Sequence, residues 1–388
     1  MRVEQMVRQL VGKCSSDVHQ SRLKAVTKVV EGVINAGRLT PASIGRRLPG
    51  GTSPKHGIKC VDRLVGNAGL AMERWHFFHA IAHRLLSGWS SPVILVDWTQ
   101  VMGEHEALVA AVPIGGRALP IYFEIHPLKK LGNTAVEESF LHSVHSILPA
   151  GCRPVIVSDA GFKGPFLQAV RALGWHFLGR VRGTAKAVAL DGGATIAKEE
   201  FYARASTTPT DLGGFQLFMD HRIACRLVLV RKARKPGPKP PPPRCKEERE
   251  LRQSALDPWL LATSVTDGQA AYIVSLYAKR MQIEECFRDA KNHRFGWSLR
   301  DVRTASLLRA VVILLLAVIA MVVVTLIGLT AELRGAHRRF QANSIRHTRV
   351  LSFFVLGCTI LSRGDPTDFP SPIEFRASLG LISGRANA

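Results

Sequence analysis

The sequence predicts a mixed α/β protein with a helical region at each end of the chain. Apolar residues recur every three or four positions in residues 1–80, which is the spacing of amphipathic helices. Between residues 91 and 182, short apolar runs alternate with amphipathic segments, the pattern of a sheet whose strands are connected by helices. From about residue 268 to about 345 the pattern is helical again, and a short helical tail follows.

Residues 1–85 are predicted to form a helical DNA-binding region. Two short helices surround a glycine-rich turn, and the second, in TSPKHGIKCVDRLVGN, carries Lys55, Lys59 and Arg63. Such a pair of helices suggests a helix-turn-helix arrangement, in which the second helix meets the DNA. A plain helical bundle with a solvated basic face fits nearly as well.

Residues 90–182 are predicted to hold the first part of the core. SPVILVDW is a buried strand that ends near Asp97, and ALVAAVPI and LPIYFEIHP flank a GGR turn as an antiparallel hairpin. RPVIVSDAGF is a further strand, closed by Asp159. The predicted order is strand, strand, strand, helix, strand, helix, strand.

Residues 183–270 are predicted to be a β-rich insertion. It contains a proline-rich basic stretch at residues 231–249, where proline excludes regular structure. That stretch is expected to be a mobile loop, either a solvated linker or a contact to phosphate. DPWLLATS, with Trp259, returns as a strand.

Residues 310–329 carry no charged side chain and reach the length of a membrane span. The alternative is a helix buried on all sides in a large core. Because it is the only such segment and basic sequence flanks it, we expect burial and no membrane partner.

The charge of the chain points to nucleic acid. Lysine and arginine number 52 against 30 aspartate and glutamate residues, a net charge of +22. Such an excess attracts polyanions. The seven cysteines include no CxxC pair, which fits reduced thiols in a cytoplasm.

Asp97 and Asp159 each follow a run of buried aliphatic residues, VILVD and VIVSD. A carboxylate there is costly unless it is paired or bound to a cation. On neighbouring parallel strands, the two carboxylates would lie roughly 5 Å apart. Their repulsion would then favour a bridging divalent cation with oxygen ligands, Mg²⁺ or Mn²⁺.

The stretch YAKRMQIEECFRDAK is predicted to be one helix with a polar stripe. Its members are three, four and seven residues apart: Tyr277, Arg280, Glu284 and Lys291. Arg288 extends the stripe, whereas Glu285 points about 100° away from Glu284. Ordinary helical ion pairs would explain the same pattern, but a metal-binding glutamate beside phosphate-binding cations would require it.

These residues resemble the Y-x2-R-x3-E-x6-K signature of bacterial insertion-sequence transposases of the IS-four family, within the DDE superfamily. VDWT and SDAGF resemble the two aspartate motifs of that family, and DPWLLATS is also similar. The resemblance covers about residues 40–310 and implies an RNase H-like core interrupted by a β-rich insertion. The implied segments are a DNA-binding region (1–85), the first core part (90–182), the insertion (183–270), the second core part (271–330) and a helical tail with a possible dimer contact (331–388).

The resemblance implies that Asp97, Asp159 and Glu284 hold two Mg²⁺ ions, with Mn²⁺ as an alternative, and cut and rejoin DNA. Water would cleave the phosphodiester at each end of the element, and the freed 3′-hydroxyl would attack target DNA. Phosphates near the cut would be held by Tyr277, Arg280, Lys291 and Arg288. The resemblance also implies a hairpin intermediate at the transposon end that is later reopened.

The resemblance also implies that Trp259 stacks on a flipped base, although a tryptophan of the core is equally compatible. The partners would be the inverted-repeat ends, target DNA and a second copy of the chain, in a bacterial cytoplasm at the nucleoid. Two other readings remain open. One is an RNase H-like nuclease or resolvase without strand transfer, and the other is an inactive relic that only binds DNA.

Overall fold

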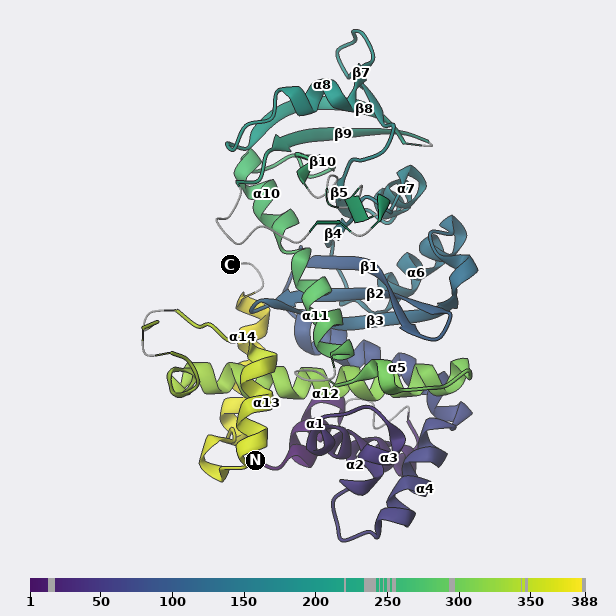
Figure 1. Ribbon diagram of the computed structural model, residues 1–388, viewed down its shortest axis with the longest axis vertical. Coiled ribbons are helices and arrows are strands. Elements are labelled where there is room, and N and C mark those ends of the chain that lie inside the picture. The colour runs from purple at the N-terminus through teal and green to yellow at the C-terminus, as the bar shows by residue number, and fades with distance from the viewer. Residues whose placement is uncertain are drawn as a thin grey trace. The chain divides into compact units, whose positions relative to one another are not determined.

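The computed structural model describes most of the chain, and Figure 1 shows it as a ribbon. The described residues are 1–12, 18–219, 221–233, 242–243, 245–246, 248–249, 252, 256–292, 297–342, 344–345 and 348–385. Most of the predicted basic loop at residues 231–249 lies outside them. The chain forms two compact units, residues 1–152 with 281–388 and residues 153–280. The five predicted segments stay a prediction beside this division.

The first unit begins with the predicted helices. They are α1 (Val3–Val11), α2 (Gln20–Ala36), α3 (Pro41–Arg46), α4 (Pro54–Val65) and α5 (Ala68–Leu86). Helices α3 and α4 approach so closely that a Cβ atom on Gly57 would lie 2.1 Å from the carbonyl oxygen of Gly45. Only glycine allows this backbone contact, so the packing of the two helices is fixed by the residues at their crossing.

Three antiparallel strands follow in the same unit: β1 (Val93–Met102), β2 (His105–Ile114) and β3 (Arg117–Pro127). The predicted hairpin of β2 and β3 is confirmed, and Gly115 and Gly116 adopt the positive φ angles of its turn. Helices α5, α6 (Thr134–Ile147) and α11 (Met281–Lys291) pack on this sheet, as does the long helix described next (Figure 1).

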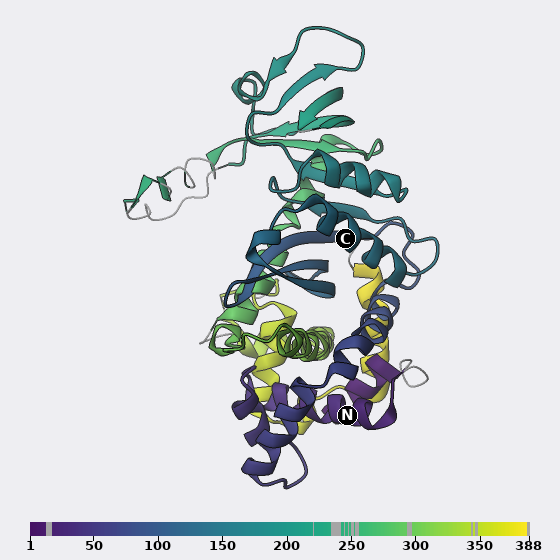
Figure 2. The same ribbon diagram turned by 90° about the vertical axis from the view of Figure 1, so that its right-hand side faces the viewer.

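The long apolar segment forms α12 (Leu307–Leu333), which passes through the middle of the first unit. It is seen along its axis in Figure 2, with other helices around it. By length and composition it is the one described helix that could cross a membrane, yet 94% of its most apolar stretch is buried. The prediction of a buried core helix is confirmed. The short helix η3 (Leu299–Asp301) precedes α12, and the unit ends with η4 (Ala336–Phe340), α13 (Phe353–Arg363), η5 (Pro366–Asp368) and α14 (Pro372–Arg385).

The second unit is a twisted sheet with helices on it. Its strands are β4 (Val155–Ser158), β5 (His176–Arg180), β6 (Lys186–Ala189), β7 (Ile196–Ala197), β8 (Thr210–Met219), β9 (His221–Val230) and β10 (Trp259–Thr263). They lie in the order β4-β5-β10-β9-β8-β6-β7, with β4 parallel to β5 and the other pairs antiparallel. The helices are α7 (Gly164–Ala172), α8 (Lys198–Ala203) and α10 (Ala270–Ala278). The predicted mixed α/β class is confirmed.

Two sequence expectations are wrong. The helix predicted from about residue 268 onward is broken at Lys279 and Arg280, which form a turn between α10 and α11. The signature residues therefore lie on two helices. In addition, Asp97 does not end its strand, because β1 continues to Met102 with Asp97 paired to Val109 of β2. The apolar run ends at Asp97 because polar residues follow it in β1. A prediction based on hydrophobicity alone therefore ends the strand too early.

Candidate active site

In the first unit, the alternation of β1 decides where Asp97 points. Trp98 turns toward α6, where its Nε1 donates a hydrogen bond of 3.0 Å to Glu137 Oε1. Because successive strand residues face opposite sides, Asp97 and Thr99 share the other face, against which α11 packs. Thr99 confirms this direction, since its Oγ1 accepts a hydrogen bond of 2.6 Å from Lys291 Nζ of α11.

Asp97 and Glu284 line one cavity of about 630 Å³ between β1 and α11. Its other lining residues are Trp98, Thr99, Phe287, Arg288, Lys291, Asn292 and Arg300. Two carboxylates and three cations thus face the same space. The cavity offers oxygen ligands for a divalent metal and positive charge for phosphate.

The charge of Lys291 interacts with several charged groups in and near the cavity. Burial lowers the pKa of the Lys291 ammonium, and the nearby charge of Arg300 lowers it further. The carboxylates of Glu106 and Asp97 act in the opposite direction. Lys291 therefore lies within the field of both Asp97 and Arg300, in a half-buried position where its charge is weakly solvated.

Glu285 points elsewhere and is held by other arginines. Its carboxylate lies 2.8 Å from Arg288 and 3.8 Å from Arg117 of β3. Arg117 also donates a hydrogen bond of 2.6 Å from Nε to Asp289 Oδ2. Of the two adjacent glutamates, Glu284 lines the cavity, while Glu285 takes part in the contact of α11 with the sheet.

Asp159 belongs to the second unit. It comes directly after β4, as predicted, and its Oδ1 accepts a hydrogen bond of 2.8 Å from the backbone N–H of Gly161. This contact folds the carboxylate over the turn that follows the strand. Asp159 is not among the residues that line the cavity between β1 and α11, so its convergence with the other two acids stays a prediction.

Tyr277 and Arg280 lie in the second unit with Asp159. Burial raises the pKa of the Tyr277 hydroxyl, the charge of Arg280 lowers it, and that of Asp159 raises it. Two further cations act on the same hydroxyl: Arg180, the last residue of β5, and Arg182, two residues later. The border between the units thus falls inside the signature: Tyr277 and Arg280 accompany Asp159, whereas Glu284 and Lys291 accompany Asp97.

Trp259 is buried in β10, with 8% of its surface exposed. Its ring meets Tyr277 edge to face at a centroid distance of 4.9 Å, and the Lys232 ammonium lies 4.6 Å from its centroid. In this structure Trp259 is therefore a residue of the hydrophobic core. Stacking on a flipped base stays a prediction and requires the indole to become accessible.

Among the residues that the structure describes, no three His, Cys, Asp or Glu side chains form a group that could hold a metal ion. Asp97 and Glu284 nevertheless fit two ligand positions, since both line one cavity and both supply oxygen. Asp159 is the third carboxylate of the prediction and lies in the other unit.

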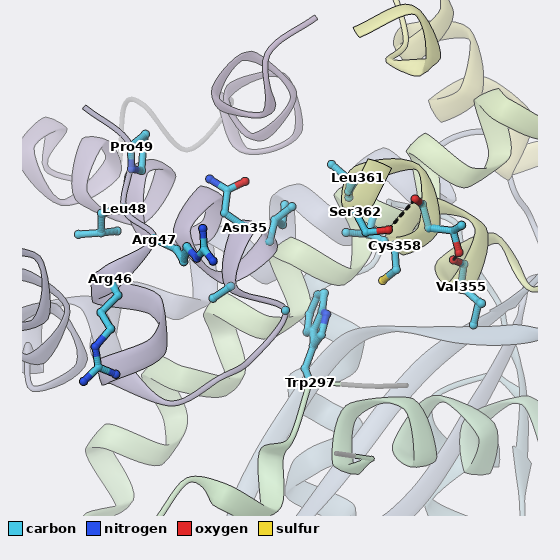
Figure 3. Close-up of a pocket in the computed structure, with 15 residues that line it drawn as sticks. Asn35, Arg46, Arg47, Leu48, Pro49, Trp297, Val355, Cys358, Leu361 and Ser362 are labelled. Atoms are coloured by element: carbon cyan, nitrogen blue, oxygen red, sulfur yellow. Dashed lines mark hydrogen bonds between the residues drawn. The ribbon is translucent and has the colours of Figure 1, made fainter. Parts of the chain in front are cut away.

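The predicted DNA-contact residues of the N-terminal region, Lys55, Lys59 and Arg63, are all exposed on α4. Near them, the end of α3 contributes Arg46 and Arg47 to a further cavity of about 970 Å³, drawn in Figure 3. That cavity is larger than the one at Asp97, but it shares no lining residue with it and contains no carboxylate among its lining side chains.

Sequence reasoning missed four residues of these sites. Thr99 directly follows the VDW motif, and Arg300 lies beyond the signature in a segment without periodicity. The alternating cations Arg180 and Arg182 lie within the predicted strand WHFLGRVRG, and this alternation is the one detectable signal among the four.

Residues 88–322, more than half of the chain, match the family model described as Transposase DDE domain. The matched residues include Asp97, Asp159 and Glu284. No curated protein matches the chain. Among solved structures, the chain is similar to a cryo-EM structure of the piggyBac transposase synaptic complex with hairpin DNA. The identity is 10%, the TM-score is 0.43, and the match covers 98% of this chain and 82% of that chain.

Proposed function

The chain belongs to the Transposase DDE domain family, and we propose that it performs cut-and-paste DNA transposition. It would hydrolyse the phosphodiester at each end of a mobile element and join the freed 3′-hydroxyl ends to target DNA. The observation that carries the proposal is the cavity in which Asp97 of β1 and Glu284 of α11 meet three basic side chains. A phosphodiester needs this combination of charges, carboxylates for a metal and cations for its own oxygens.

Asp97, Glu284 and Asp159 would hold divalent metal, with Mg²⁺ favoured and Mn²⁺ as an alternative. When bound, a pair of such ions stabilises negative charge on the attacking and leaving oxygens. The choice of Glu284 over Glu285 is supported by their surroundings, because Glu285 already contacts Arg117 and Arg288. As the finer classification of the chain, we propose an IS-four family transposase with an RNase H-like core.

Lys291 would bind a phosphate oxygen of the strand being cut. Its ammonium is anchored on Thr99, two residues after Asp97, so its position relative to that carboxylate is fixed by the strand. Burial weakens the solvation of this charge, and a phosphate would replace the missing water. Arg280 and Tyr277 would do the same near Asp159, and Arg288 would contribute once it leaves Glu285.

Exposed cations on α4 would hold the terminal inverted repeats through phosphate contacts. A second copy of the chain would be required to pair the two ends, and the reaction would take place on DNA in the bacterial cytoplasm. Light scattering of the chain with and without DNA ends tests the pairing: a mass that stays monomeric on two ends would contradict it.

The activity is tested by incubating the protein with DNA that carries the ends of its own element, with and without Mg²⁺. We expect cuts at the element ends that require the metal and are absent with Glu284→Gln. Precut ends then separate a transposase from a nuclease, because only a transposase joins them to a plasmid. Metal-dependent cutting without joining would favour the nuclease, and binding without cutting would favour the inactive relic.

A further inference from the structure

A second cavity of about 620 Å³ lies beside the turn between β1 and β2. It is lined by Gln100, Val101, Met102, Gly103, Glu104, His105, Lys291, Arg300, Val302, Arg303, Thr304 and Ala305. Lys291 and Arg300 also line the cavity that holds Asp97 and Glu284. The two cavities are therefore joined through a pair of cations.

Arg300 lies in η3, two residues after Ser298. The backbone N–H of Ser298 bonds to the carbonyl of Asn292 at 3.1 Å, and the N–H of Trp297 bonds to Asp289 at 3.1 Å. Ser298 adopts φ = 55°, the one described residue other than glycine with a positive φ. Its side chain is fully buried, and its Oγ has no hydrogen-bond partner among the described residues.

Such a backbone conformation costs about 1–3 kcal/mol and persists where the surroundings enforce it. Directly after Ser298, the short helix η3 packs against β1 and α11 and places Arg300 beside Lys291. The strained residue thus immediately precedes the segment that brings a second cation next to the first.

The carboxylates of Glu106 and Asp97 partly balance the charge of Lys291, but Arg300 is less well compensated. Arg300 is exposed and acts on the pKa of Lys291 as a like charge. In the part of the chain that the structure describes, neither Arg300 nor Arg303 forms an ion pair with a carboxylate. Glu104 is the one acid that lines the second cavity, beside His105. Like charges so close are best compensated by an anion that lies between them.

We propose that Arg300 binds a backbone phosphate adjacent to the one being cut, with Arg303 further along the same path. The DNA strand would run from the cavity of Asp97 and Glu284 into the second cavity, with Lys291 and Arg300 at the junction. Guanidinium suits this role because it forms two parallel hydrogen bonds to one phosphate. The assignment rests on the proposed function for its ligand and adds a contact outside the signature.

The test measures affinity for duplex DNA carrying the terminal sequence of the element, without metal and over a range of salt. Arg300→Ala should lower the slope of log K against log salt by about 0.9, the value for one lost phosphate contact. Arg300→Lys should restore the slope. Arg204→Ala is the control, since it removes one exposed positive charge of the second unit that lines neither cavity.

A second arm replaces single phosphates near the cut by neutral methylphosphonates. In the wild type, a methylphosphonate at one position should weaken binding about tenfold, the loss expected for one charge-assisted hydrogen bond. In Arg300→Ala the same substitution should have no further effect. Equal sensitivity of both proteins at every position, or an unchanged salt slope, would overturn the assignment. A protein that shows the predicted slopes but does not cut in Mg²⁺ would keep this contact and lose the proposed function.

Discussion

Asp97 and Glu284 line the same cavity, although one belongs to the first strand of the sheet and the other to a helix near the end of the chain. The helix reaches the sheet through Lys291, which is hydrogen-bonded to Thr99, and through Arg117, which contacts Glu285 and Asp289. The cavity of the first unit is thus built by contacts between segments that are distant in the sequence.

Replacing Glu284 should remove catalysis without removing DNA binding. Glu284→Gln keeps the shape of the side chain but loses a metal-binding charge, so we expect cleavage to fall by at least about 10³-fold, or about 4 kcal/mol. The matched control is Glu285→Gln, whose residue faces Arg117 and Arg288. Gel-based cleavage rates and binding affinities are measured for both. The larger cleavage defect in Glu285→Gln would move the metal ligand by one residue.

Arg117 should stabilise the helix that carries Glu284. Asp289 is 7% exposed, and burial raises the pKa of its carboxyl even though Arg117 opposes the shift. Arg117→Ala would leave a buried carboxylate without its partner, which costs about 3 kcal/mol in the free energy of unfolding at neutral pH. Urea denaturation measures this loss.

The loss in the free energy of unfolding caused by Arg117→Ala should depend on pH. A carboxyl group whose folded pKa is raised favours the folded state in its protonated form, and this contribution is lost as pH rises through the folded pKa. The deficit of Arg117→Ala should therefore shrink when pH is lowered below neutrality. Asp289→Asn in the Arg117→Ala background removes the charge and should recover stability at neutral pH. A deficit that is constant with pH, or unaffected by Asp289→Asn, would show that Asp289 is not its source.

The packing role of Trp259 in the core and its predicted stacking on a flipped base can be tested separately. Because the indole is buried against Tyr277, Trp259→Ala should lower the free energy of unfolding by about 3 kcal/mol or more. Trp259→Phe should restore most of that stability. If the indole also stacks on a flipped base, a folded Trp259→Phe protein should nick DNA normally but cut the second strand slowly. Normal rates at both steps would leave Trp259 with the structural role alone.

The exposed cations of α4 should control the salt dependence of end binding. Replacing Lys55, Lys59 and Arg63 by glutamine should reduce the slope of log K against log salt by up to about 2.7, or about 0.9 for each phosphate contact. Replacing the exposed Lys129 and Lys130 provides a comparison per charge removed. Equal changes in slope per charge removed in the two variants would mean that α4 makes no phosphate contact beyond the general attraction of a basic surface.

Local patterns predicted most of the elements. The β2–β3 hairpin follows from two apolar runs around Gly115 and Gly116, and the burial of α12 follows from its apolar surface on all sides. Each of these depends on residues that are neighbours in the sequence, so one sequence contains the necessary information.

The site was predictable in part for the same reason. Glu284 and Lys291 are seven residues apart on one helix, and their shared face is a local property. The turn at Lys279 and Arg280 was not predicted, because neither residue is a strong helix breaker and tertiary packing decides where α10 ends. Arg300 escaped detection because it lies outside the signature and meets Lys291 only through the tertiary packing of η3 on α11.

We propose that Asp97, Asp159 and Glu284 share bound metal, although the first and third belong to one unit and the second to the other. Iron-directed backbone cleavage measures this: Fe²⁺ in place of Mg²⁺, with ascorbate and peroxide, cuts the chain next to its ligands. We expect three sets of cuts, near residues 97, 159 and 284, all competed by Mg²⁺ and all lost in Glu284→Gln. Cuts near residues 97 and 284 without any near 159, with and without DNA ends, would contradict it.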